Sequence, residues 1–188
     1  MKIKITVVIL RREVLCLKYL VKKAQKGDKA AFVELMERHK QDLYKVAKSY
    51  LLCDEDAADA IQDTILACYE HLKDLRELRY FKTWMIRILI NKCKDILRKK
   101  ENLLEVFPEQ EDLHNYYQNL EFEGLMQMLD EKYRIVLTLY YAEEFTTKEI
   151  AQILDISENT VKTRLVRGRE KIAKEICCER LEERRTQS

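Results

Sequence analysis

Helix-breaking residues are scarce in this sequence, which contains three glycines and one proline among 188 residues. Together with the abundance of Leu, Lys, Glu and Ala, this scarcity predicts an all-α protein. Hydrophobic residues make up 47% of the chain, enough for a core although 36% of the residues are charged, so we do not expect wholesale disorder. The formal net charge is only +2, so any affinity for nucleic acid has to come from local clusters of Lys and Arg.

Signals of catalysis and of cofactor binding are also missing. No CxxC pair occurs among the six cysteines, no His lies at ligand spacing from them, and there is no glycine-rich phosphate loop. The three histidines, His39, His71 and His114, are scattered. We therefore expect no enzyme activity, no metal, no cofactor and no small-molecule substrate. The cysteines fit a reducing cytoplasm as small apolar residues, and the role of the adjacent Cys177 and Cys178 stays open.

The N-terminus reads MKIKITVVIL, a basic start followed by an apolar run from Ile5 to Leu10. Arg11 and Arg12 end this run, no small-residue cleavage site follows, and the run is too short to span a bilayer. We interpret residues 1–17 as an N-terminal extension of unassigned role. We expect a cytoplasmic protein without stable membrane insertion.

Helical periodicity begins at Asp28, the predicted N-cap of a helix with an apolar stripe from Phe32 to Tyr50. The next segment, CDEDAADAIQDTILACYEHL, has five acids and no base in its first part. Acids in the first turn of a helix interact favourably with its dipole, but five exceed what capping needs. An acidic face that docks onto a basic partner protein is the other interpretation, and both stay open at this point.

The segment FKTWMIRILINKCKDILRKK predicts a helix with an apolar side and a basic side. Residues 82–100 hold seven bases and one acid. The inward side is predicted to contain Phe81, Trp84, Met85, Ile88, Leu89, Ile96 and Leu97. Helical spacing places together, on the other side, Arg87, Asn91, Lys94, Asp95 and Arg98. A basic face with Asn and aromatic neighbours suits phosphate and base contacts, and the alternative is an ordinary solvated face.

The charge of the chain reverses between residues 101 and 123, where seven acids occur without Lys or Arg and where the only proline, Pro108, is found. This composition is typical of a linker between two domains. A helix break is predicted after it, at Asp130. The following residues form an apolar stripe at helical spacing, which we expect to be core: Tyr133, Val136, Leu137, Tyr140 and Tyr141.

The most informative stretch is TTKEIAQILDISENTVKTRLVRGREKI. Thr146 and Glu149 fit a capping box that opens a helix over residues 147–154. Asp155 follows where glycine is usual, because the backbone there is left-handed, and Asp tolerates that conformation better than most residues. Ser157 then caps a second helix. Cap, core, turn and charge agree on a helix-turn-helix, whose second helix enters the major groove, and an ordinary helical hairpin is the alternative.

The second helix is predicted to bury Val161, Leu165 and Ile172 and to expose a basic surface, with six bases and two acids between residues 158 and 174. Its charge attracts phosphates, and Arg and Lys can bind the edge of guanine. The residues predicted to contact DNA are Asn159, Thr160, Lys162, Thr163, Arg164, Arg167, Arg169 and Lys171.

An acidic helix, an aromatic and basic helix, an acidic linker and a basic helix-turn-helix thus follow one another. This order resembles a bacterial sigma factor of the sigma-70 family, in its two-domain extracytoplasmic-function (ECF) group. The resemblance runs from about residue 18 to residue 174. It is carried by LVKKAQKGDKAAF, DEDAADAIQDTI, FKTWMIRILINKCKDILRK and FTTKEIAQILDISENTVKTRLVRGREKI.

The resemblance implies a division of the chain into five parts. They are an extension (1–17), sigma domain 2 (18–100), an acidic linker (101–120), sigma domain 4 (121–178) and a tail (179–188). It also implies three partners: core RNA polymerase, promoter DNA and an anti-sigma factor.

Roles for individual residues follow from the same resemblance. The acidic helix would bind the clamp helices of the polymerase beta-prime subunit through Asp56, Asp59, Gln62 and Asp63. The basic helix would recognise and open the minus-10 element through Trp84, Arg87, Asn91, Lys94, Asp95 and Arg98. The connector over residues 74–80 would capture a flipped base, and the linker would thread toward the polymerase channels. The helix-turn-helix would read the minus-35 element and touch the beta flap.

Two other classes of protein stay open. A DNA-binding regulator with a C-terminal helix-turn-helix would have a ligand pocket or a phosphoacceptor in its first half. A module that binds polymerase or an anti-sigma factor without reading DNA would explain the acidic helix, but it would leave both basic faces without a role.

Overall fold

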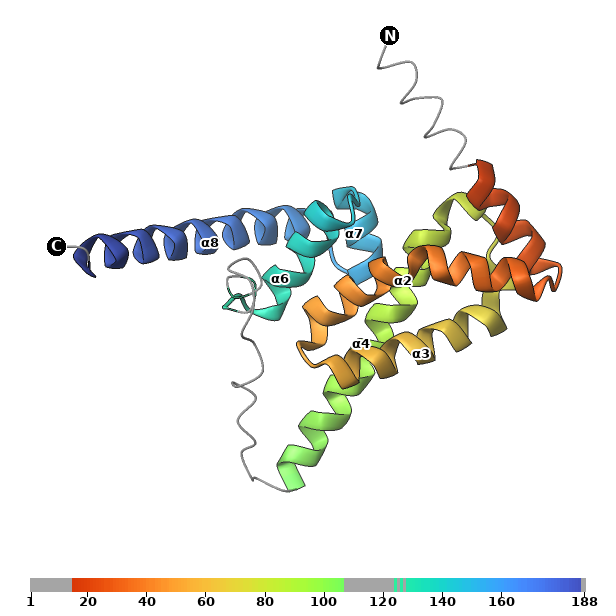
Figure 1. The fold of residues 1–188 in the computed structure, drawn as a ribbon, viewed down its shortest axis with the longest axis horizontal. Helices are drawn as coiled ribbons and strands as arrows, with labels where there is room; N and C mark the ends of the chain where they lie inside the picture. Colours follow the sequence, from red (N-terminus) through yellow and green to blue (C-terminus); the bar gives the residue numbers. More distant parts are fainter. Residues whose placement is uncertain (1–14, 107–123, 125, 127, 187–188) are drawn as a thin grey trace, which may run out of the picture.

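The structure, a computed structural model, describes the backbone of residues 15–106, 124, 126 and 128–186, with side chains up to residue 100 and from 124 to 175 (Figure 1). Every regular element within these ranges is helical, as the composition predicts. The helices form two units that pack against each other. Most of the predicted extension, most of the predicted linker and the side chains of Cys177 and Cys178 lie outside the described residues.

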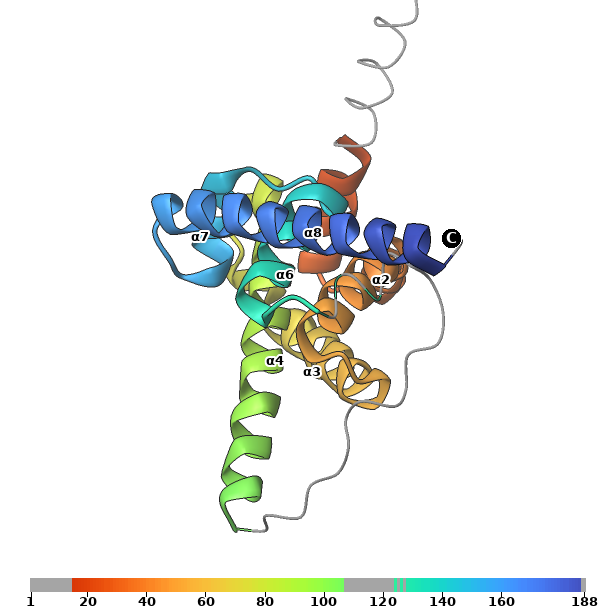
Figure 2. The same ribbon diagram turned by 90° about the vertical axis from the view of Figure 1, so that its left-hand side faces the viewer.

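The first unit contains a helix over residues 15–25, α2 (Lys29–Leu51), α3 (Asp54–His71) and α4 (Phe81–Val106). The carboxylate of Asp28 accepts a hydrogen bond from the amide of Ala31 at 3.0 Å, which confirms the predicted N-cap of α2. The apolar stripe of α2 from Phe32 to Tyr50 is buried, and α3 packs on both α2 and α4. α4 continues past the predicted helix end at Lys100, and its C-terminal half projects beyond the other helices (Figure 2).

The second unit contains α6 (Glu131–Leu137), the π-helix η3 (Thr138–Ala142), α7 (Thr147–Leu154) and α8 (Glu158–Thr186). α6 begins immediately after Asp130, so the predicted break is confirmed. α8 packs on α6 and α7, and its C-terminal part extends away from the body of the protein (Figure 1).

The expectation that Tyr140 and Tyr141 are core is wrong, because they are 39% and 57% exposed. The π-helix explains the difference: the amide of Glu143 bonds to the carbonyl of Thr138, five residues back, at 3.1 Å. This wider turn changes the phase of the apolar stripe. Leu139 is buried in place of the two tyrosines, whose rings pack edge to face at the surface with centroids 5.0 Å apart.

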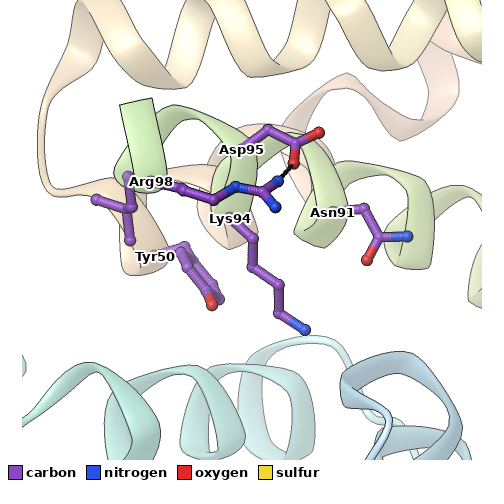
Figure 3. A pocket seen from close by; sticks show the side chains of 6 residues that line it. Tyr50, Asn91, Lys94, Asp95 and Arg98 are labelled. Atoms are coloured by element: carbon purple, nitrogen blue, oxygen red, sulfur yellow. Dashed lines mark hydrogen bonds and ion pairs between the residues drawn. The ribbon is translucent and has the colours of Figure 1, made fainter. Parts of the chain in front are cut away.

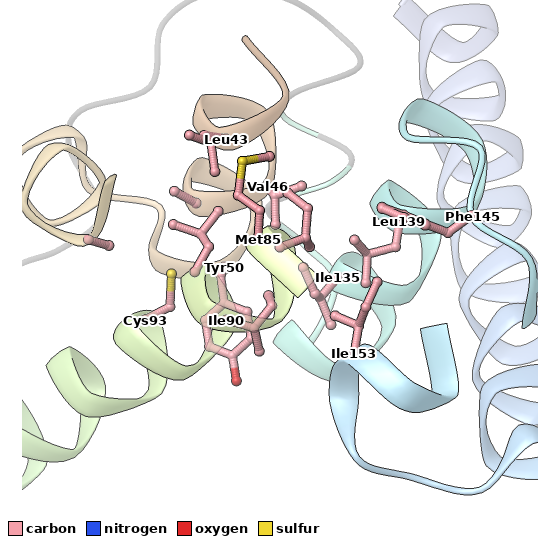
Figure 4. Close-up of a cluster of buried hydrophobic side chains, with 14 of the residues drawn as sticks. Leu43, Val46, Tyr50, Met85, Ile90, Cys93, Ile135, Leu139, Phe145 and Ile153 are labelled. Atoms are coloured by element: carbon pink, nitrogen blue, oxygen red, sulfur yellow. The ribbon is translucent and has the colours of Figure 1, made fainter. Parts of the chain in front are cut away.

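The two units share one hydrophobic core (Figure 4). Figure 4 shows Val46, Met85 and Ile90 of the first unit in one cluster with Ile135 and Ile153 of the second unit. α4 therefore packs on α2 and α3 and also on α7. For this reason Ile86 and Ile90 are fully buried, although helical spacing did not place them on the inward side. Four residues that helical spacing did place there are only half-buried: Trp84, Ile88, Ile96 and Leu97.

Candidate nucleic-acid interface

The helix-turn-helix forms as its local chemistry predicts. The Thr146 hydroxyl accepts from the Glu149 amide and the Glu149 carboxylate accepts from the Thr146 amide, which completes the capping box at the start of α7. Asp155 adopts the left-handed conformation, with φ 57° and ψ 49°. The Ser157 hydroxyl accepts from the Thr160 amide at 3.0 Å and so caps α8.

The core between α7 and α8 sets how the second helix is presented. Ile150 and Val161 are fully buried and Leu165 is 6% exposed, so this packing decides which side of α8 faces solvent. Most of the predicted DNA contacts are therefore at the surface: Asn159, Lys162, Thr163, Arg167, Arg169 and Lys171 are exposed, whereas Thr160 and Arg164 are half-buried.

Several of these side chains already have partners within the protein. Lys162 lies 2.9 Å from Glu158, and Lys171 lies 3.0 Å from Asp130. The Thr160 hydroxyl is 2.8 Å from the Ser157 hydroxyl, and the Thr163 hydroxyl donates to the carbonyl of Asn159. Arg167 is exposed and takes part in neither of these ion pairs. Exposed ion pairs of this kind contribute little to stability, so Lys162 and Lys171 can exchange them for phosphates at small cost.

The predicted face of α4 lines a cleft of about 480 Å³ (Figure 3). The structure brings Asn91, Lys94, Asp95 and Arg98 together there, as helical spacing predicts. Arg98 donates a hydrogen bond to Asp95. Arg87 is exposed on α4 and Trp84 is half-buried beside Phe81, with ring centroids 6.0 Å apart, but neither lines the cleft.

Tyr50 of α2 completes the cleft wall, a role that sequence reasoning missed because its spacing predicts only core. Burial raises the pKa of the Tyr50 hydroxyl, and the Glu131 carboxylate of α6 raises it further. Lys94 extends across the cleft toward the second unit (Figure 3). The basic face of α4 thus lies opposite the second unit and remains open to solvent at Asn91, Lys94 and Arg98.

Some acidic residues of α3 lie in its first turn, and some form ion pairs with α4. Asp54, Glu55 and Asp56 lie in its first turn, where they favour the helix dipole. Asp56 pairs with Lys100 of α4, and Asp63 lies 3.9 Å from Lys92 of the same helix. Asp59 and Gln62 are exposed. Part of the acidity of α3 thus joins this helix to α4, and Asp59, Gln62 and the largely exposed Asp63 face solvent.

Two buried charges that sequence reasoning missed lie where the units meet. The Arg134 guanidinium of α6 donates to the carbonyl of Ser49 in α2 and, at 2.9 Å, to that of Leu129. The buried Glu143 carboxylate lies 2.8 Å from Lys82 of α4. Neither residue carries a sequence signal, because their burial results from contact between segments far apart in the chain.

No helix in the part of the chain that the structure describes is long and apolar enough to cross a membrane.

A helix-turn-helix with a basic second helix is typical of a DNA-binding protein, and the other helical unit carries a second basic helical face. Models of known protein families match the two units in the same order along the chain. The family model "Sigma-70 region 2" matches residues 35–102, and "Sigma-70, region 4" matches residues 119–172. The chain belongs to the sigma-70 family of RNA polymerase sigma factors.

Curated relatives match over most of their length. The ECF RNA polymerase sigma factor SigW of Bacillus subtilis is 31% identical over 180 residues, which cover 85% of this chain and 96% of SigW. The chain therefore belongs to the ECF group of the family. The RNA polymerase sigma factor SigV of the same organism is 29% identical over 151 residues, which cover 78% of this chain and 91% of SigV.

Solved structures share the fold. CnrH, solved in complex with the cytosolic domain of CnrY, superimposes with a TM-score of 0.66 at 26% identity, over 87% of this chain and 98% of CnrH. The sigma factor RpoE of Bartonella quintana, solved in complex with the anti-sigma factor NepR, has a TM-score of 0.66 at 22% identity, over 76% of this chain and 94% of that one. The two-unit helical fold is therefore one that sigma factors adopt.

Proposed function

We propose that this protein is a sigma factor that binds core RNA polymerase and directs promoter-specific initiation of transcription. The observation that carries the proposal is the presence of two basic helical faces, on α4 and α8, in a chain that matches both sigma-70 regions in order. Two such faces on separate units can contact two elements of one promoter. Polymerase supplies the chemistry, and this chain supplies recognition, so the protein is not an enzyme and works in the cytoplasm.

Domain 2 (18–100) recognises and opens the minus-10 element, with Trp84, Arg87, Asn91, Lys94, Asp95 and Arg98 as its DNA contacts. Opening a duplex costs a few kcal/mol for each unstacked base step. Aromatic and apolar side chains offset this cost when they stack on an extruded base or enclose it. The lysines and arginines of α4 bind the phosphates of the separated strand while the duplex is open.

Domain 4 (121–178) reads the minus-35 element through α8, which enters the major groove. Arg164 and Arg167 bind base edges or phosphates in this proposal, together with Asn159, Thr160, Lys162, Thr163, Arg169 and Lys171. The acidic linker (101–120) joins the two domains. An anti-sigma factor is the regulatory partner, a proposal supported by the solved relatives, one of which is in complex with NepR.

Core polymerase binds the acidic side of α3 through its beta-prime clamp helices. Asp59 and Gln62 supply the exposed part of this surface, with Asp63 beside them. Asp56 supports the surface through its ion pair with Lys100. Domain 4 touches the beta flap.

The decisive experiment is capture of purified bacterial core RNA polymerase by this protein, followed by transcription from the captured complex. We expect a stable complex that initiates only at specific promoters. Specific duplex binding by the free protein without binding to core would favour an ordinary helix-turn-helix regulator. Binding to core without any promoter preference would favour an interaction module.

Charge reversal tests the docking surface. The double variant Asp59→Lys/Asp63→Lys should lower the affinity for core polymerase by at least tenfold. Glu70→Lys, a single charge reversal at an exposed position near the end of the same helix, is the control and should bind like the wild type. Equal affinities for all three proteins would remove α3 from the polymerase interface.

A further inference from the structure

Gln25 joins the N-terminal helix of the described chain to the segment between α3 and α4. Its side-chain amide donates two hydrogen bonds, to the carbonyl of Leu72 at 2.9 Å and to the carbonyl of Leu75 at 2.8 Å. An amide nitrogen carries two hydrogens, so both are used. The partners lie 47 and 50 residues away in the sequence, so this contact is purely tertiary.

The two carbonyls are the ends of one short turn. The 3₁₀ turn η1 (Leu72–Asp74) follows α3 directly, and Leu75 leaves it with an extended backbone. The turn itself is closed by one bond, from the Leu75 amide to the Leu72 carbonyl at 3.2 Å. Such short turns are weakly held by their own hydrogen bonds. Gln25 therefore fixes the point at which the chain leaves α3, and with it the start of the connector to α4.

The connector carries side chains that suit a nucleic-acid base. Tyr80, in the second short turn η2 (Leu78–Tyr80), is 42% exposed, and the Arg79 guanidinium lies 4.8 Å from the centre of its ring. Arg76 is exposed as well. Aromatic rings with arginine beside them are platforms on which unpaired bases stack. Leu75 and Leu78 are partly buried against the core, so the backbone position of the connector decides where Tyr80 stands.

We propose that Gln25 is a positioning residue for base capture: its two hydrogen bonds hold the connector over residues 74–80 in the shape that receives an unpaired base of the opened promoter strand. The proposal rests on the proposed function. It assigns a part in promoter recognition to the helix over residues 15–25, which lies outside the matched sigma-70 region 2.

Binding of single-stranded DNA to the holoenzyme tests this role. The probe is the strand that wild-type holoenzyme selects from a pool of short random-sequence oligonucleotides. Each position of the probe is then made abasic in turn, and the ratio of the two affinities measures how much each base contributes. We expect wild-type holoenzyme to show one position with a large ratio.

Removal of the donors should lower that ratio selectively. In Gln25→Leu, which has no donor, the ratio at this position should fall by roughly tenfold, while the ratios at other positions and binding to the minus-35 duplex stay unchanged. Gln25→Glu is nearly the same size and has no N–H donors, so it should lower the ratio in the same way. It replaces Gln25→Leu if that variant folds poorly. Gln25→Lys keeps N–H donors and should restore the ratio. Its added positive charge should raise the affinity for the intact and the abasic probe alike, so this effect cancels in the ratio.

Gln41→Leu, at an exposed glutamine of α2, is the matched control and should keep the wild-type ratios. Wild-type ratios in both donor-free variants would overturn the role of Gln25, as would an equal fall at every position or a failure of Gln25→Lys to restore the ratio. Those results would leave the sigma function in place. Wild-type holoenzyme without any position-dependent ratio would overturn minus-10 reading itself, and this inference with it.

Discussion

The ammonium of Lys82, at the start of α4, lies 2.8 Å from the Glu143 carboxylate, at the end of η3, and so joins the two units of the protein. The Glu143 side chain is completely buried. Lys82 also lies 3.1 Å from Asp42 and 5.4 Å from the centre of the Phe145 ring. A buried charge is tolerated only with a partner, so Lys82 is what allows the Glu143 carboxylate to lie buried where the two units meet.

Removal of Lys82 alone should therefore lower the free energy of unfolding more than removal of Lys82 and Glu143 together. Lys82→Met leaves Glu143 buried without its partner, and we expect the free energy of unfolding to fall by about 3 kcal/mol. Lys82→Met/Glu143→Met should regain part of that loss, because no carboxylate is then left at the buried position. Urea unfolding monitored by circular dichroism measures all three proteins. Lys40→Met, at a lysine whose side chain is 72% exposed, should change stability by less than about 0.5 kcal/mol. A double variant less stable than Lys82→Met would contradict this account.

Stability should decrease in acid through Asp42. Burial alone would raise the pKa of its carboxyl, but the hydrogen bond with His39 and the charge of Lys82 outweigh burial and lower the pKa from 3.8 to about 2. Because the folded-state pKa lies below the unfolded one, the stabilisation is complete above about pH 4 and is lost as the pH falls toward 2. It amounts to roughly 2 kcal/mol. Asp42→Asn should be less stable than the wild type near neutral pH, and urea titrations should show the difference shrinking below pH 4. A difference independent of pH would refute this role.

Gly168 of α8 should resist substitution although it lies within a helix. Replacement of glycine by alanine in a helix normally adds about 1 kcal/mol of stability. A Cβ at Gly168 would lie 3.0 Å from Cδ1 of Leu137 and 3.4 Å from Cβ of Tyr133, and both side chains are buried. We expect Gly168→Ala to destabilise the protein by about 1 kcal/mol or more, because α8 must move away from α6. Gly124→Ala, where nothing lies within 4 Å, is the control in thermal unfolding. A rise in Tm for Gly168→Ala would contradict this prediction and show that Leu137 moves aside at little cost.

Arg164→Ala and Arg167→Ala separate base contacts from phosphate contacts in the proposed minus-35 reader. A lost base contact should cost about 1–3 kcal/mol and relax specificity at one position, whereas a lost phosphate contact should weaken all sequences alike and lower the salt dependence by about one unit. Holoenzyme binding to a selected promoter duplex at several salt concentrations measures both. Lys132→Ala removes one exposed positive charge from α6 and controls for net charge. Unchanged binding in both arginine variants would remove α8 from the reading surface.

Local chemistry made much of the fold predictable. Asp28 caps α2, and Thr146 with Glu149 opens α7 at the expected residue, because a cap is satisfied by neighbours in the sequence. Asp155 takes the left-handed turn as expected. The face of α4 that lines the cleft was also predictable, since residues three and four apart share one side of any α-helix.

Errors arose where distant segments meet or where the helix changes its period. Tyr140 and Tyr141 are exposed because a π-helix changes the phase of the stripe, and periodicity analysis assumes a constant α-helical turn. Ile86 and Ile90 are buried because a second unit covers α4 from another side. A single helical pattern cannot indicate how many neighbours the helix has.

The sequence by itself thus determined the helical class, the caps, the helix-turn-helix and the two basic faces, because each depends on residues within a few turns of one another. Only the tertiary structure decided how the units meet. It placed Lys82 against the buried Glu143, and it aimed the Gln25 amide at the carbonyls of Leu72 and Leu75. Such contacts depend on the packing of helices that are remote in the chain, and no local spacing encodes that packing.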